Sequence, residues 1–164
     1  SVKDYFIDNI ESYKIIFVDG YFDQFLSQTS HDGFDICIMS AAFGKPKYSK
    51  IVEKYFNKLA DFDDSMSSLN TAFSKEGVYI HVPRNIVVDK PVEIIHFATG
   101  NEAALMLQPR NLVVIEENSE IEIIESHYSL TVNPILTNSV TEILLKKIQK
   151  LITTNCKMMS SALI

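Results

Sequence analysis

The phrase PRNIVV at residues 83–88 returns almost unchanged as PRNLVV at residues 109–114. A second near-repeat follows each copy, VEII at residues 92–95 and IEII at residues 121–124. The spacing is 26 for the first phrase (109 − 83) and 29 for the second (121 − 92). Self-similarity at a period of roughly 20 to 50 residues is typical of stacked-repeat architectures. The repeat therefore predicts a solenoid in which each coil uses the same corner, a proline and a polar pair that lead into an apolar strand.

Short strands are expected throughout residues 77–143. Runs rich in Val and Ile follow one another there with polar breaks and no helical period, which favours strands over helices. The runs read VYIHV, NIVVD, VEIIHF, AALMLQ, NLVVIEE and EIEIIESHY. A solenoid coil buries its inner face only by stacking on a neighbour. We therefore expect residues 77–143 to form β-helix coils (a β-solenoid), with an antiparallel sandwich as the alternative.

Residues 1–76 show a different pattern and are expected to form a small mixed α/β segment. Apolar residues flank Asp19-Gly20, a strong hairpin signal because glycine tolerates positive φ. Residues 33–39 indicate a short buried strand. After Pro46, apolar residues at helical spacing predict one helix, and Asp63 or Asp64 could serve as the N-cap of a second, short helix.

The tail, residues 144–164, breaks the repeat. Leu144, Ile148, Leu151 and Ile152 fall on one stripe with lysines opposite, which predicts an amphipathic helix where a third coil is expected. A competing interpretation is that a single-base loss near Leu144 puts this tail out of frame. The neighbouring frame can encode VEKNSKIDYY, a near copy of IEENSEIEII at residues 115–124. On that interpretation Cys156 has no evolved function.

Composition narrows the classes of partner. The chain has 164 residues and a net charge of −6, which argues against nucleic acid and against an anionic membrane surface, since both attract basic proteins. No apolar run approaches the roughly 20 residues of a membrane span, and the start has no pattern of a secretion signal. The two cysteines, Cys37 and Cys156, are too few and too far apart for a disulfide framework. We therefore expect a cytoplasmic protein.

Long phrases of the chain resemble the SufB/SufD family of iron–sulfur cluster assembly proteins. They are LNTAFSKEGVYIHVPRNIVVDKPVEIIHF at 69–97, PRNLVVIEENSEIEIIESHYS at 109–129 and LTNSVTEI at 136–143, and LNTAFSKEGVYIHVP favours the SufD side of the family. The resemblance implies a right-handed parallel β-helix after an N-terminal α/β segment. It also implies a scaffold subunit that works with a SufB-like protein and a SufC-like ATPase, in a complex that builds an iron–sulfur cluster.

The family's leading helical region, later coils and C-terminal helical region have no counterpart here, so the resemblance implies a truncated chain. No catalytic, cofactor or metal residue carries over, and we expect no cofactor on this chain and no enzymatic activity. A solenoid carbohydrate-active enzyme and a purely structural β-solenoid interaction module are the alternatives. Because a stack with an open end exposes unpaired strand edges, we also expect that end to be covered by the tail, by a second copy of the chain, or by both.

The histidines are the first candidates for metal ligands. His96 and His127 follow the two similar strands at similar places, so they could approach each other across the stack. Neither has a second His or Cys at ligand spacing along the chain. We therefore expect them to be exposed histidines at strand ends rather than metal ligands. His31 and His81 are weaker candidates for metal ligands. Strand alternation should turn the His81 side chain away from one apolar face.

Other candidate residues have simpler interpretations. Cys37 lies among apolar residues and is expected to pack in the core. Glu120 and Glu122 resemble the carboxylate pair of a sugar-cleaving enzyme. They alternate with isoleucines, however, which is the pattern of polar residues on the solvent-exposed face of a half-buried strand. Gly44 and Lys45 lack the frame of a phosphate-binding loop.

Overall fold

The computed structural model describes residues 10–29, 33–60, 63–100, 104–146 and 150–159, so His31 lies outside the described residues. The strands of these residues form three sheets. In spatial order, sheet A contains β11 (Lys150–Met159), β8 (Glu120–Ser129), β5 (Val92–Ala98), β1 (Tyr13–Val18) and β2 (Tyr21–Phe22). Sheet B contains β10 (Val140–Leu145), β7 (Arg110–Ile115), β4 (Val78–Val82) and β3 (Asp35–Ile38). Sheet C pairs β6 (Leu105–Leu107) with β9 (Ile135–Thr137).

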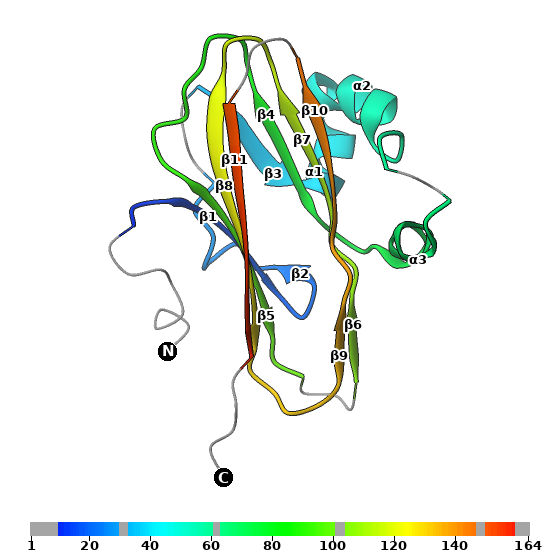
Figure 1. Cartoon of the computed structure of the whole chain (residues 1–164). Helices are drawn as coiled ribbons and strands as arrows, with labels where there is room; N and C mark the ends of the chain where they lie inside the picture. Colours follow the sequence, from blue (N-terminus) through cyan, green and yellow to red (C-terminus); the bar gives the residue numbers. More distant parts are fainter. Residues whose placement is uncertain (1–9, 30–32, 61–62, 101–103, 147–149, 160–164) are drawn as a thin grey trace.

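From β4 onward the chain visits the sheets in a fixed order, B then A then C, and begins again at β7 and at β10. Strands of successive rounds pair in parallel within each sheet. The register aligns Tyr79 with Leu112 in sheet B, Val92 with Ile123 in sheet A, and Leu105 with Ile135 in sheet C, so the offset is similar in all three. Figure 1 shows the consequence, strands of successive rounds lying side by side in long stacks.

This register corrects the prediction that the PRNIVV and PRNLVV phrases occupy equivalent corners. Pro83 follows the end of β4, whereas Pro109 directly precedes β7. The equivalent corner residues are Asn85 and Asn118, which have φ of 63° and 56°, and the amide of Asn118 donates to Asn85 Oδ1 at 3.2 Å. Asparagine tolerates this left-handed conformation better than most residues. The NIVVD run is also no strand; it contributes one bridge, from Val87 to Glu120.

The N-terminal segment joins the same sheets. β1 runs parallel to β5 and forms the expected hairpin with β2 across Asp19-Gly20, where Gly20 has a φ of 83°. The predicted strand is β3, which pairs antiparallel with β4. The two predicted helices are α2 (Pro46–Tyr55) and α3 (Ser65–Phe73), and a short α1 (Met39–Gly44) precedes them without having been predicted. Asp64 caps α3 by accepting a hydrogen bond from the Ser67 N–H at 2.7 Å.

The prediction of a helical tail is wrong for the residues described there. β10 ends at Leu145, and residues 150–159 form β11, which pairs in parallel with β8 so that Lys150 lies beside Glu120. The third round therefore arrives where the repeat places it, and the tail covers the edge of β8. A short apolar run such as Leu151-Ile152 is compatible with a strand as well as with a helix. Pairing with β8 therefore decides the outcome. The reading frame and a second copy at the open end stay predictions.

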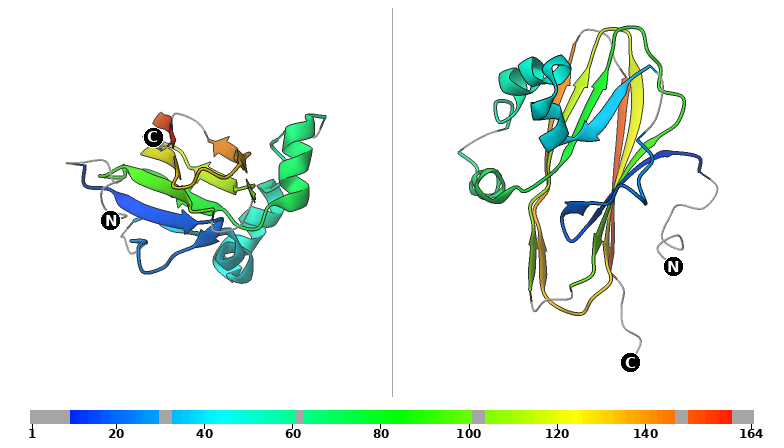
Figure 2. Two further views of the ribbon diagram at one scale, coloured as in Figure 1. Left: turned by 90° about the horizontal axis from the view of Figure 1, so that it is seen from below. Right: turned by 180° about the vertical axis from the view of Figure 1, so that it is seen from behind.

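Three apolar cores hold these layers together. The largest lies between the inner faces of sheets A and B, with Ile15, Ile80, Val92, Val113 and Ile123 among its buried members. A second lies between the outer face of sheet B and the helices α1 and α2, which Figures 1 and 2 show on that side of the molecule. A third covers the outer face of sheet A. Within the described residues, no helix is long and apolar enough to cross a membrane.

Candidate functional site

A polar cluster interrupts the apolar inner face of sheet A. Along β5 and β8, Val92, Ile94, Ile121 and Ile123 belong to the inner core, and strand alternation puts His96, Glu125 and His127 on that same inner face. The parallel register places His96 directly beside His127. Their rings stack at a centroid distance of 4.6 Å and an interplanar angle of 7°. The expected approach of the two histidines across the stack is therefore confirmed.

Glu125 completes the cluster. Its Oε1 lies 3.3 Å from His96 Nε2 and 3.4 Å from His127 Nε2, and it accepts a hydrogen bond from the Ser139 hydroxyl at 2.8 Å. His96 is only 4% exposed and Glu125 only 8%. The prediction that these histidines are exposed at strand ends is thus wrong for His96, because its strand continues to Ala98 and sheet C faces this part of sheet A.

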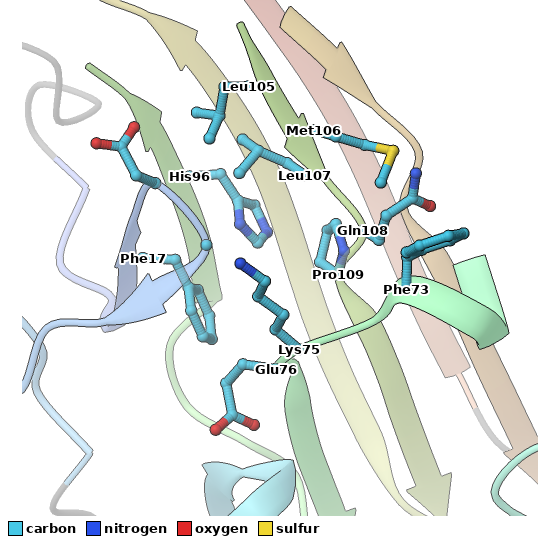
Figure 3. Close-up of a pocket in the computed structure, with 12 residues that line it drawn as sticks. Phe17, Phe73, Lys75, Glu76, His96, Leu105, Met106, Leu107, Gln108 and Pro109 are labelled. Carbon is cyan, nitrogen blue, oxygen red and sulfur yellow. The ribbon is translucent and has the colours of Figure 1, made fainter. Parts of the chain in front are cut away.

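The surroundings fix the cluster in place. The Phe17 ring stacks on the other face of His96 at 5.1 Å, so the three rings form a continuous ladder across β1, β5 and β8. His96 also lines a small cavity with Phe17, Leu105 and Leu107. Figure 3 shows Lys75 extending into this same space. The cavity gives one side of an otherwise packed cluster room for a small molecule or ion.

Burial and mutual contact shape the charges of the cluster. Burial lowers the pKa of His96, which favours the neutral imidazole. Burial alone would raise the pKa of Glu125, but the contacts with His127 and His96 outweigh it and lower the pKa. Glu125 is therefore a carboxylate at neutral pH. A neutral imidazole and a carboxylate are the forms that coordinate metal ions.

Sequence reasoning missed Glu125, although a signal for it exists. Ile121, Ile123, Glu125 and His127 are spaced two apart in EIEIIESHY, so an inward-facing isoleucine row implies an inward-facing Glu125. Ligand spacing along the chain gives no sign of the cluster, because its members come from one face of β8 and from the strand beside it. Bringing His96 to Glu125 requires the register that pairs β5 with β8.

The remaining candidates occupy ordinary positions. His81 lies on the outer face of sheet B as expected, with its two ring nitrogens 3.4 Å from Asp35 and 3.3 Å from Glu116. Cys37 packs against the outer core of sheet B, and burial raises the pKa of its thiol, which keeps it protonated. Glu120 is exposed, with its carboxylate 3.7 Å from Lys150. Glu122 is half-buried on the same outward face of β8.

Gly44 and Lys45 are the last of the candidate residues. Lys45 separates α1 from α2, so the segment around Gly44 turns between helices and forms no phosphate loop.

A buried ion pair, which sequence reasoning also missed, joins Arg110 of β7 to Glu142 of β10. Glu142 also accepts three backbone hydrogen bonds at 2.9–3.0 Å, from the N–H groups of Asn57, Lys58 and Leu59. This network is structural, because the protein itself satisfies both of its buried charges.

Comparison with known proteins assigns the family. Residues 4–94 match the model of the SufBD protein N-terminal region. An iron-sulfur cluster assembly SufBD family protein of Synechocystis is 24% identical over 153 residues, which is 88% of this chain and 34% of the relative. The iron-sulfur cluster assembly protein SufD of Bacillus subtilis is 32% identical over 90 residues, 54% of this chain and 20% of the relative. The chain thus spans about a third or less of these curated relatives. Because the family model covers more than half of it, the chain belongs to the SufBD family.

Proposed function

We propose that this chain acts as part of a scaffold subunit in the iron–sulfur cluster assembly machinery of the SUF type. The observation that carries the proposal is the family match over residues 4–94, supported by two relatives that are both named for iron–sulfur cluster assembly. By the same relationship we propose a SufD-like role, with a SufB-like protein and a SufC-like ATPase as partners in the cytoplasm.

We also propose that the stacked sheets are the first coils of a right-handed parallel β-helix. Support comes from the fixed order in which the chain visits sheets B, A and C, and from the parallel pairing of successive rounds at similar offsets in all three sheets. A stack of this kind grows by adding coils, so partner surfaces can be built on its sides and at its ends. That property suits a scaffold whose work is to hold other subunits.

The scaffold role predicts that the purified chain has no ATP turnover of its own and assembles no iron–sulfur cluster when incubated anaerobically with ferrous iron and sulfide. ATP turnover is measured by phosphate release, and cluster assembly by visible absorption and sulfide content. Stoichiometric cluster formation or sustained ATP hydrolysis by the chain alone would contradict the proposal. A polysaccharide cleavage screen tests the enzymatic alternative, and cleavage that Glu120→Gln or Glu122→Gln abolishes would replace the scaffold role.

A further inference from the structure

We propose that His96, Glu125 and His127 bind one divalent transition-metal ion inside the stack, with an open coordination position toward the cavity beside His96. One ligand atom from each of these three residues lies within 4.8 Å of the other two. Two imidazoles and a carboxylate are a recognised donor set for zinc and for related first-row metals. The inference stands on this geometry and does not depend on the role in cluster assembly.

The spacing of the donor atoms suits a common ion. In a tetrahedral site with bonds of roughly 2.0–2.2 Å, neighbouring ligand atoms are separated by about 3.3–3.6 Å. The two separations between Glu125 Oε1 and the histidine Nε2 atoms, 3.3 and 3.4 Å, already have this length. The two rings are nearly parallel, so binding requires a tilt that brings one nitrogen of each toward the ion.

One of the three proposed ligand atoms lacks a hydrogen-bond partner within the protein. In the described part of the chain, His96 Nε2 is buried and makes no hydrogen bond, although it lies 3.3 Å from Glu125 Oε1. His127 Nδ1 is also unsatisfied, but the His127 nitrogen that approaches Glu125 is Nε2, so Nδ1 gives no support to the site. Leaving a buried polar atom without a partner is unfavourable, so such an atom calls for an explanation. Coordination by a metal ion would satisfy a nitrogen that the protein leaves without a partner.

The site is built on rigid elements and has an outer layer of support. Its three ligands come from two paired strands, and Phe17 holds the His96 ring by stacking. Ser139 donates a hydrogen bond to Glu125 Oε1, which orients the carboxylate. Outer contacts of this kind typically change metal affinity by about 10- to 100-fold when removed. The donor set favours Zn²⁺, Co²⁺, Ni²⁺ or Fe²⁺ over Mg²⁺ and Ca²⁺, which prefer all-oxygen sites.

The test is a titration of the metal-free 164-residue chain with Co²⁺, followed by visible absorption. We expect one equivalent to give a d–d spectrum of nitrogen and oxygen ligation, without the thiolate charge-transfer band that binding by cysteine would produce. Zn²⁺ should displace the Co²⁺. Saturation at one equivalent with that spectrum supports the site, whereas no saturable binding or a thiolate band would overturn it.

Variants locate the ion. His127→Asn and Glu125→Gln should weaken Co²⁺ binding by more than about 100-fold, and Ser139→Ala, a milder change, by about 10-fold or more. His81→Gln is the matched control, because its nitrogens also face carboxylates at 3.3–3.4 Å but on opposite sides of the ring, where they cannot share an ion. Circular dichroism selects the folded variants, and Ser139→Ala removes one hydrogen bond while leaving all three ligands in place. Binding that His81→Gln abolishes, or that folded Ser139→Ala and Glu125→Gln leave unchanged, would refute the assignment.

Discussion

Replacing Glu142 with alanine should destabilise the protein more than any change to a surface ion pair. Glu142 is 2% exposed, pairs with the guanidinium of Arg110, and accepts the N–H groups of Asn57, Lys58 and Leu59 at 2.9–3.0 Å. Arg110 is itself 1% exposed, so the substitution leaves an unpaired buried charge and three backbone donors without their acceptor.

The expected magnitude follows from these contacts. Removing one partner of a buried ion pair is destabilising by about 3–5 kcal/mol. For a domain of this size about 1 kcal/mol corresponds to a change of about 2–4 °C in Tm, so Tm should fall by about 6–20 °C. Glu142→Gln keeps an oxygen acceptor and should lose less. The double variant Arg110→Met/Glu142→Gln should recover part of the loss, because the uncompensated buried charge is gone.

Urea denaturation followed by circular dichroism measures the free energies of unfolding. The control is Arg84→Ala, which removes an exposed ion pair to Glu117 at 2.9 Å and should change stability by less than about 1 kcal/mol. If Glu142→Ala unfolds within about 1 kcal/mol of the wild type, the buried network has been given too large a role.

Three further predictions concern the rest of the fold. Gly77→Ala should be destabilising by about 1–3 kcal/mol or more, because an added Cβ would lie 1.8 Å from the Arg110 carbonyl oxygen, and a urea midpoint equal to the wild type would contradict this close approach. Asp64→Ala should lower the urea midpoint, because α3 loses the cap on the Ser67 N–H, whereas Asp64→Asn should retain most of the wild-type stability. Equal midpoints for Asp64→Ala and the wild type would contradict a stabilising cap. Burial works to raise the pKa of Asp35, but hydrogen bonds to its carboxylate outweigh burial and lower that pKa below its usual value. The contribution of Asp35 to stability should therefore be complete above its unfolded-state pKa and should be lost as the pH falls through its folded-state pKa. Urea midpoints from pH 7 to pH 3 should therefore fall less steeply in Asp35→Asn than in the wild type, and parallel curves would refute the assignment.

Much of the fold was predictable because its signals are local. Asp19-Gly20 predicts its own hairpin, Asp63 or Asp64 predicts the start of α3, and the short run VEIIHF, rich in Val and Ile, predicts β5. Each of these features depends on the conformation of a few adjacent residues. The same locality made the tail misleading, since the apolar spacing that indicates a helix was overridden by the open edge of β8.

The register and the site could not be predicted from such local signals. The similar phrases in the sequence align Pro83 with Pro109, whereas the paired strands align Tyr79 with Leu112. The register is set by which side chains face inward and by the corner at Asn85 and Asn118. An error of a few residues in register hides every contact between strands of successive rounds. The Arg110–Glu142 pair and the approach of Glu125 to His96 both depend on that register.

The most direct test of the account is to co-express the affinity-tagged chain with the SufB-like and SufC-like proteins of the same genome and to measure the mass and stoichiometry of what is eluted. The scaffold proposal predicts that the SufB-like protein is retained in a defined ratio to the chain, with the ATPase retained through the complex. Elution of the chain alone, beside a SufB-like and SufC-like complex that forms without it, would contradict the proposal.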